Sequence, residues 1–307
     1  MTDAMRDGRW RLSAPESSVL LWGPETRDRE VLKLALLELV VRKALRLVSV
    51  QERRLYFWTK RTNVLTVDPP VARRPSRSLQ AVIDAHPRLF SYSNGTFGAP
   101  IEAWARAVFE RYRQRGGYVQ AEVLPALEER GFFTREQSMR LGMFASTQWM
   151  ITPAGESASE ELSGLLDTGR VLFGLNTTGS GVAREAPDPA QVRAYVDAAG
   201  AALLLLRGHY PEIRRQLGRA SGRRIGGNHE RHVDGPIVVF VGGELWWPED
   251  EARVAPSEPT DADAGHLEVD DLAENLGPEP FDGIDGAYDA IDAGVDSGGG
   301  GDGDGGE

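Results

Sequence analysis

The chain has 307 residues with 35 basic and 46 acidic side chains and no cysteine, which gives a formal net charge of -11. The absence of cysteine excludes a disulfide framework, a thiolate metal site and a cysteine nucleophile. The charge is unevenly placed, because residues 249–307 carry 19 acidic side chains and one arginine, whereas the preceding 248 residues carry 27 acidic and 34 basic ones. We therefore expect an arginine-rich body with a net charge of +7 and an acidic tail with a net charge of -18.

Residues 1–11 form a polar and charged N-terminal lead without the apolar region of a secretory signal. The most apolar stretches, 31–48 and 196–206, contain charges or are too short to cross a bilayer. These features predict a cytoplasmic protein that can associate with a membrane only peripherally.

The first predicted elements contain the centre of the domain. Residues 12–22 form a brief apolar segment broken by Pro15, and Thr26 has the residue type of an N-cap for a helix over 27–48. That helix is apolar on nearly every face, which predicts a central, buried position. The β-branched and aromatic residues of 54–67 predict a β-hairpin.

The middle of the chain alternates helices and loops. Residues 78–85 predict a short helix, and the Gly, Ser and Asn residues of 91–100 predict a loop. Apolar residues at helical spacing predict an amphipathic helix over 101–115. A second helix over 118–130 is expected to kink at Pro125.

The segments 134–139 and 144–151 lead into a predicted helix over 156–166, and another helix is predicted over 189–207. The domain over 12–217 is therefore expected to be mainly helical, with a central buried helix and small β-hairpins. An arginine- and glycine-rich loop with a β-hairpin follows over 218–248. The acidic, Gly- and Asp-rich residues 249–307 cannot form a core and are predicted to be a disordered tail.

Catalytic and cofactor motifs are not found in the sequence, which has no G-x-G-x-x-G, P-loop, H-E-x-x-H or G-x-S-x-G pattern. His229 and His232 are close in sequence but have no obvious third ligand, and a metal site requires three or four. We therefore expect a non-catalytic protein without a metal or another cofactor.

The type and grouping of the cations suit anion binding, whereas the alternative for each cluster is that its arginines are simply solvated on the polar face of a helix. Arginine binds phosphate through two parallel hydrogen bonds, and tryptophan suits a membrane interface. The first cluster is Arg27/Arg29/Lys33, which follows Trp22 closely in sequence. Further clusters are Arg42/Lys43/Arg46, Arg73/Arg74/Arg77, Arg111/Arg113/Arg115 and Arg214/Arg215/Arg219/Arg223/Arg224.

The tail contains an apolar stripe at helical spacing. Its members are Phe281, Ile284, Tyr288, Ile291 and Val295, and an aspartate follows each of them. Such a segment could dock as a helix on a basic groove of a protein partner or of its own chain. The alternative is a disordered tail that only increases solubility.

The segment LSAPESSVLL (12–21) resembles the opening of the Golgi phosphoprotein 3 family, which is also called the GPP34 domain. The run LALLELVVRKALRLV (34–48) resembles its central helix, and RRLYFWTKRTNVLTVDPP (53–70) resembles its hairpin. The stretch EVLPALEERGFFTREQSMRLGMFASTQWMIT (122–152) is similar to its helix, turn and following strand-like segment, and PDPAQVRAYVDAAGAALLL (187–205) to a late helix.

The resemblance implies a mainly helical fold and peripheral binding to phosphatidylinositol 4-phosphate. The headgroup pocket of the family uses a tryptophan before the central helix, an arginine at its start and two arginines on a later helix. The arginine positions fall near Leu34, Gly117 and Gln120, so the nearest available residues are Trp22, Arg27, Arg29 and Lys33.

The leading hypothesis is therefore a GPP34-like adaptor that binds an anionic phospholipid surface. A winged-helix protein whose acidic tail covers a DNA-binding face is the alternative. Both the helix and hairpin over 27–67 and the helix–strand–TPAG–helix series over 118–166 resemble winged-helix topology.

Overall fold

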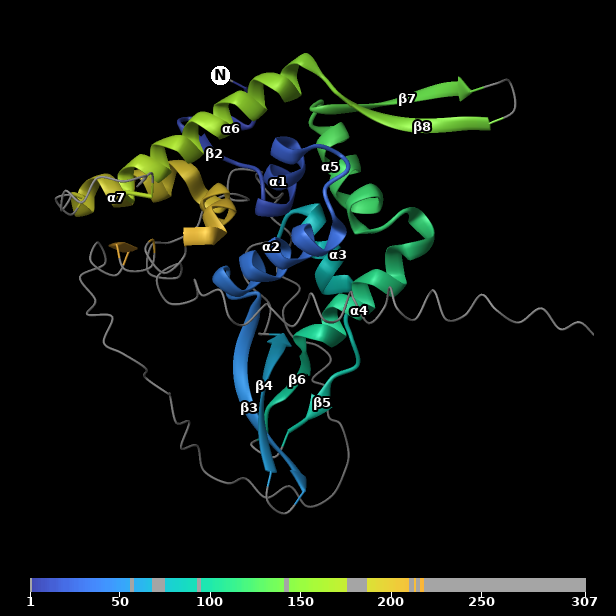
Figure 1. Cartoon of the computed structure of the whole chain (residues 1–307), viewed down its shortest axis with the longest axis vertical. Coiled ribbons are helices and arrows are strands. Elements are labelled where there is room, and N and C mark those ends of the chain that lie inside the picture. The colour runs from blue at the N-terminus through green and yellow to red at the C-terminus, as the bar shows by residue number, and fades with distance from the viewer. Residues whose placement is uncertain are drawn as a thin grey trace, which may run out of the picture.

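Two consecutive helices, α1 (Ala14–Trp22) and α2 (Asp28–Val41), lie at the centre of the computed structural model (Figure 1). The structure describes residues 2–55, 58–67, 75–92, 95–140, 144–175, 187–209, 213, 216 and 217. Within this part α1 contacts α2, α3, α5 and α6. The prediction of a mainly helical domain with small antiparallel sheets is confirmed.

The other helices surround this pair or extend from it. They are α3 (Arg77–Asp84), α4 (Ile101–Tyr112), α5 (Leu124–Glu129), α6 (Pro153–Leu172) and α7 (Pro189–Ala199), with 3-10 turns η1 (Arg113–Arg115) and η3 (Gly200–His209) and a π-helical turn η2 (Val119–Val123). The strands are β1 (Met5–Arg6), β2 (Arg9–Trp10), β3 (Leu45–Leu55), β4 (Trp58–Val67), β5 (Phe90–Ser91), β6 (Phe97–Pro100), β7 (Phe133–Arg140) and β8 (Phe144–Ile151).

Helix α1 begins with a capping box. The Ser13 hydroxyl accepts the N–H of Glu16 at 3.4 Å, and the Glu16 carboxylate accepts the N–H of Ser13 at 3.1 Å. Pro15 lies in the first turn, where its missing N–H has no helical partner to lose. The prediction that Pro15 breaks an apolar segment is therefore wrong, because proline at this position favours a helix.

Helix α2 is the predicted central helix, and its residues from Val31 to Val41 are buried except Lys33. Its predicted end at residue 48 is wrong. The helix stops at Val41, and Lys43 adopts a left-handed conformation with φ 59°. The N-terminal cap is Arg27 rather than Thr26, whose hydroxyl instead donates to the carbonyl of Gly23 at 2.6 Å.

The apolar run that continues beyond α2 belongs to a strand. β3 pairs with β4 from Leu45 opposite Val67 to Leu55 opposite Trp58, so the hairpin is much longer than the predicted 54–67. The four-stranded sheet has the order β3-β4-β6-β5. Strand β6 and Ser91 of β5 lie in the segment predicted as a loop. Strand β6 pairs with both β4 and β5, and local composition does not reveal such pairing between distant segments.

The predicted helix at 118–130 is split by Pro125, which has no N–H to continue the regular hydrogen-bond ladder. Its first part is the π-helical η2 and its second part is α5. The next two segments form the hairpin β7–β8, which extends away from the helices (Figure 1). Helix α6 is longer than predicted, since Thr152 caps it by accepting the N–H of Gly155 at 3.1 Å.

The two ends of the described fold pack on the same core. The N-terminal lead forms the hairpin β1–β2, and Trp10 is buried with its Nε1 donating to the Ser17 hydroxyl at 2.7 Å. The predicted helix at 189–207 ends at Ala199 and continues as the 3-10 turn η3, whose residues 201–206 are buried. The predicted loop and hairpin at 218–248 and the tail at 249–307 lie outside the described residues.

Candidate functional site

The four residues of the predicted anion site lie at the connection between α1 and α2. Trp22 is the last residue of α1 and is 46% exposed, and Arg27 at the N-cap of α2 is also exposed. Arg29 and Lys33 follow on the first turns of α2 and are less accessible. The four predicted residues therefore lie at one connection, and Trp22 and Arg27 are the two that are exposed to solvent.

Arg29 and Lys33 share the same acidic neighbour. The Glu30 carboxylate lies 3.8 Å from Arg29 Nε and 4.0 Å from Lys33 Nζ. A carboxylate between two cations reduces the field that both can offer to an external anion. Trp22 and Arg27 are therefore the members of the predicted site best placed to meet a ligand.

Asp28 joins this connection to the helix that begins at Tyr118. Its two carboxylate oxygens accept the N–H groups of Tyr118 and Val119, each at 2.9 Å. A carboxylate at the N-terminus of a helix accepts hydrogen bonds from the free amides of the first turn and interacts favourably with the positive end of the helix dipole. Burial raises the pKa of Asp28, although the two hydrogen bonds act in the opposite direction. The amides that begin η2 are thus occupied by a carboxylate of the chain itself.

Gln120 links the same connection to the β7–β8 hairpin. Its Nε2 donates to the carbonyl of Pro24 at 3.3 Å, and its Oε1 accepts the indole N–H of Trp149 at 2.7 Å. The Arg135 guanidinium stacks 4.5 Å from the centre of the Trp149 ring. Three segments that are far apart in sequence therefore meet at one place.

We call this place the α1–α2 junction, defined by Trp22, Pro24, Arg27, Gln120 and Trp149. Arg135 at its edge forms an ion pair with Glu128 at 2.9 Å. Sequence reasoning reached Gln120 only through the GPP34 resemblance, and it missed Trp149 and the adjoining Asp28, because the contacts of these residues join positions 29 to 96 residues apart.

Replacement of Gly117 by alanine is expected to disturb this junction. A Cβ atom at Gly117 would lie 2.0 Å from an Asp28 carboxylate oxygen, and the backbone has φ +97°. The matched control is Gly131→Ala, which has a similar φ of +76° but meets nothing within 4 Å. We expect G117A to lose about 1 kcal/mol more unfolding free energy than G131A. Urea denaturation measures the difference, and equal losses would contradict the role given to Asp28.

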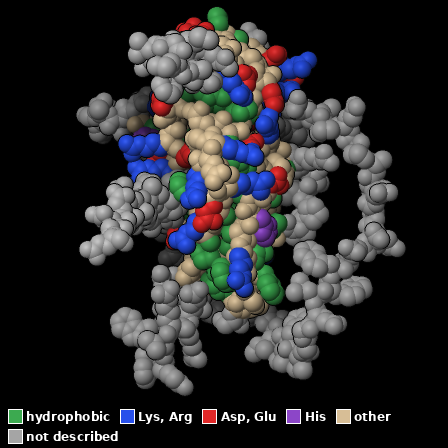
Figure 2. All heavy atoms as spheres, turned by 90° about the vertical axis from the view of Figure 1, so that its right-hand side faces the viewer, with side chains coloured by type: hydrophobic (Ala, Val, Ile, Leu, Met, Phe, Trp, Pro, Cys, Tyr) green, Lys and Arg blue, Asp and Glu red, His purple; other side chains and the backbone are tan. Residues whose placement is uncertain are grey.

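Other predicted cation clusters are partly used within the protein. Arg42 binds the buried carboxylate of Glu38, and Arg77 forms ion pairs with Glu122 and Glu129. Arg111 donates to the carbonyl of Asp84. A pocket of about 510 Å³ at the end of α4 is lined by Glu110, Arg111, Arg113, Gln114 and Arg115. Cationic side chains are also visible across the middle of the face in Figure 2.

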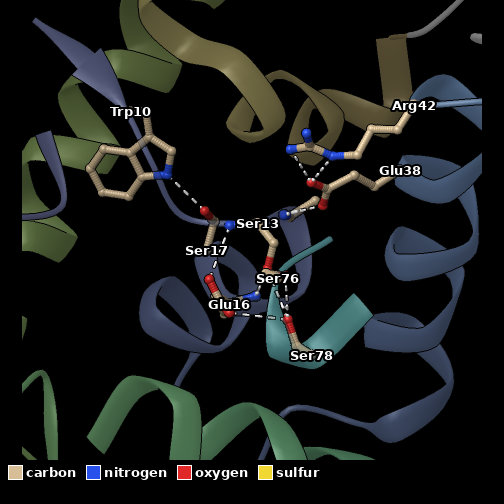
Figure 3. Close-up of polar contacts among 9 residues, drawn as sticks. Trp10, Ser13, Glu16, Ser17, Glu38, Arg42, Ser76 and Ser78 are labelled. Atoms are coloured by element: carbon tan, nitrogen blue, oxygen red, sulfur yellow. Dashed lines mark hydrogen bonds and ion pairs between the residues drawn. The ribbon is translucent and has the colours of Figure 1, made fainter. Parts of the chain in front are cut away.

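A cluster of buried polar side chains fixes α1 against α2 and α3 (Figure 3). The Ala14 N–H donates to Glu38 Oε2 at 2.6 Å, and the Arg42 guanidinium contacts Glu38 Oε1 at 2.7 and 2.8 Å. Burial raises the pKa of Glu38 against the lowering effect of Arg42. The carboxylate thus binds the start of α1 and the residue that follows its own helix, α2.

The same cluster continues toward α3. The Ser78 hydroxyl lies 3.0 Å from Glu16 Oε1, 3.1 Å from the Ser13 hydroxyl and 3.0 Å from the Ser76 hydroxyl. Ser13, Glu16 and Ser78 are almost completely buried. A substrate cannot reach these hydroxyls in this conformation, so their geometry supports a structural role.

Helix α2 bears on the DNA-binding alternative. A recognition helix presents a polar face to the bases. Ten of its residues are buried, and they occupy every side of the helix between Val31 and Val41. In this conformation α2 therefore offers no base-reading face.

Among the residues that the structure describes, no group of three or more His, Asp or Glu side chains is arranged to hold a metal ion. None of the helices in these same ranges is long and apolar enough to cross a membrane. His229, His232 and the predicted tail helix with Phe281, Ile284, Tyr288 and Ile291 lie outside the described residues.

Comparison of the chain with protein-family models, curated proteins and solved structures finds no match.

Proposed function

We propose that this chain is a non-catalytic, GPP34-like adaptor that binds anionic phospholipid headgroups at the α1–α2 junction. The observation that carries the proposal is the exposure of Trp22 and Arg27 beside the contacts of Gln120. Tryptophan favours the interfacial region of a bilayer, and arginine binds phosphate with two parallel hydrogen bonds. Together they supply the two interactions that reversible membrane association needs.

The resemblance to the GPP34 family supports the same place. The family's headgroup positions correspond to the loop before the central helix and to the region of Gly117 and Gln120. In this chain that loop contacts Gln120, and Asp28 from the start of α2 contacts the amides after Gly117. The corresponding surfaces therefore adjoin, although the residues that form them differ.

The differences determine which residues we assign to the headgroup. Leu34 is 1% exposed and cannot reach a ligand, while Gly117 and Gln120 carry no charge. The proposal therefore places the phosphate beside Arg27, with Arg29 and Lys33 as weaker contributors because they share Glu30. Each cation near an anionic surface contributes about 1 kcal/mol, so the binding is expected to be reversible.

Vesicle co-sedimentation tests the proposal. The full chain should pellet with vesicles of phosphatidylcholine and phosphatidylserine, and more strongly when phosphatidylinositol 4-phosphate is present, but not with phosphatidylcholine alone. We expect Trp22→Ala together with Arg27→Glu to lower the affinity for these vesicles roughly tenfold or more. The double variant changes the charge by two units and removes one interfacial side chain.

The control is Arg9→Glu, which makes the same charge change at an exposed position on β2. Its affinity should fall less than that of the junction variant. Equal loss in both variants would mean that only net charge matters, and equal pelleting of the wild type with all vesicles would overturn the proposed function. A gel shift with duplex DNA and no selective pelleting would favour the nucleic-acid alternative.

A further inference from the structure

The hairpin of β5 and β6 exposes two phenylalanines. Phe97 is 65% exposed and Phe90 is 47% exposed, and Val67 on the neighbouring strand β4 is 40% exposed. The other large apolar side chains with comparable exposure in the described part of the chain are Trp22, Met150 and Val171, which lie on other elements. Figure 2 shows apolar side chains gathered at the lower end of the described surface, with cationic side chains above and among them.

The two phenylalanines project from opposite faces of the hairpin. Phe90 pairs with Gly98, and the next pair joins Ser91 to Phe97. Successive pairs along a β-ribbon point their side chains to opposite sides. A flat protein surface could cover only one of these rings, whereas a bilayer entered by the hairpin surrounds both.

The backbone of the hairpin is already paired across the two strands. Beyond the ladder, the N–H of Tyr92 donates to the carbonyl of Thr96 at 2.9 Å, and the N–H of Gly95 donates to the carbonyl of Tyr92 at 2.9 Å. Peptide groups that enter a water-poor interface must be satisfied internally. This hairpin therefore needs fewer new partners for its backbone than an open loop would.

The charge of the segment also suits an anionic surface. Residues 85–100 contain no aspartate or glutamate. Arg88 and His86 are exposed just before β5. Carboxylates would be repelled by anionic lipids and are costly to insert, whereas an arginine beside an inserted aromatic ring can contact headgroups.

We infer that Phe90 and Phe97 insert into the interfacial region of an anionic bilayer, with Arg88 at the headgroups. This inference rests on the proposed function, because it supplies a second attachment of the same protein to the same membrane. Two attachments on different elements would also fix the orientation of the protein on the surface. A cleft in a protein partner or in a second copy is the competing occupant.

A site-specific label distinguishes insertion from other contacts. The chain contains no cysteine, so Phe97→Cys can be labelled at one position with an environment-sensitive fluorophore. Addition of phosphatidylcholine–phosphatidylserine vesicles should shift its emission to shorter wavelength, and quenchers on the acyl chains should reduce it. The control is Val171→Cys on α6, at a residue that is 60% exposed, whose label should stay in water.

Binding of unlabelled variants provides the second measurement. Phe90→Ser with Phe97→Ser should weaken vesicle affinity roughly tenfold or more, because two partly inserted rings are lost. Val171→Ser should bind like the wild type. Circular dichroism should show that all three proteins fold alike, as expected for changes at exposed side chains.

Three outcomes separate the hypotheses. If the wild type does not bind anionic vesicles, the proposed function fails and the insertion fails with it. If the wild type binds but the label at residue 97 stays in water and the serine variant binds equally well, the insertion is overturned and the proposed function stands. A spectral shift that depends on protein concentration without vesicles would assign the hairpin to a contact between copies and would also overturn the insertion.

Discussion

Replacement of Glu38 by alanine is expected to lower the unfolding free energy by about 3 kcal/mol, because it leaves two buried partners of the carboxylate unsatisfied. Glu38 is completely buried and accepts the Ala14 N–H, which begins α1, and the guanidinium of Arg42, which follows α2. The alanine variant removes the acceptor of a buried amide and of a cation whose side chain is only 13% exposed. Urea denaturation measures the loss as a lower midpoint with an unchanged slope.

A matched control lies two turns earlier on the same helix. Glu30 also contacts two cations, but at 3.8 and 4.0 Å and with its side chain 26% exposed. Exposed or half-exposed pairs contribute roughly 0–1 kcal/mol, so Glu30→Ala should cost much less than Glu38→Ala. A similar small loss in both variants would show that the carboxylate of Glu38 does not hold α1 against α2.

The pH dependence of the stability difference between the wild type and Glu38→Ala provides an independent check. Burial raises the pKa of Glu38 in the folded protein above the ordinary value of a glutamate side chain. Between the pKa of Glu38 in the unfolded chain and its higher pKa in the folded protein, the folded state binds more protons than the unfolded state. The unfolding free energy therefore rises as the pH falls through that window. Because alanine does not titrate, the stability difference between wild type and Glu38→Ala should grow over the same fall in pH. A difference that shrinks would contradict the direction of the pKa shift.

The helices could be predicted where apolar residues recur at helical spacing along one face. The buried residues Ile101, Trp104, Ala105 and Val108 of α4 follow this spacing, and the predicted helix is present. The end of α2 could not be found in this way, since only Arg42 and Lys43 interrupt the apolar residues between the helix and β3, and charged residues also occur within the helix. No glycine or proline marks the boundary, and only the left-handed conformation of Lys43 separates the two elements.

The site was predictable only where its residues are neighbours in sequence. Trp22 and Arg27 lie within one connection, so their proximity follows from the chain. Asp28, Gln120 and Trp149 are joined by folding of distant segments, and hydrophobic periodicity contains no information on such polar contacts. One signal was available, because the helix that begins after Gly117 has no Ser, Thr, Asp or Asn before it to cap its amides. Glycine has no side chain to accept these amides, so they need water or an acceptor from elsewhere in the chain, and here Asp28 accepts two of them.

The start of α1 was missed for a different reason, because its capping box is a local pattern. Ser13 and Glu16 have the S-x-x-E spacing that favours a helix start, and Pro15 between them is compatible with it. That pattern could have been recognised from the sequence. By contrast, nothing local indicates that Ser78 from α3 and Glu38 from α2 complete the same cluster.

Deletion of residues 249–307 is expected to strengthen the binding of the body to anionic vesicles. The deletion removes a net charge of -18 and changes the formal net charge of the chain from -11 to +7. An acidic segment tethered to a basic body competes with lipid phosphates for the same cations and repels the anionic surface. We expect an affinity increase of roughly tenfold or more at low salt, since fields between charges extend about 30 Å there but only about 8 Å at physiological salt.

The salt dependence and two variants of the full chain identify the cause. Co-sedimentation with phosphatidylcholine–phosphatidylserine vesicles should show a larger effect of the deletion at low salt than at high salt. Replacement of Asp282, Asp285, Asp289 and Asp292 by asparagine should reproduce part of the increase if charge is responsible. Replacement of Phe281 and Tyr288 by serine should reproduce it only if the apolar stripe of the tail docks on the body. An unchanged or weaker affinity of the truncated chain would contradict competition by the tail and would leave its acidity without a role in membrane binding.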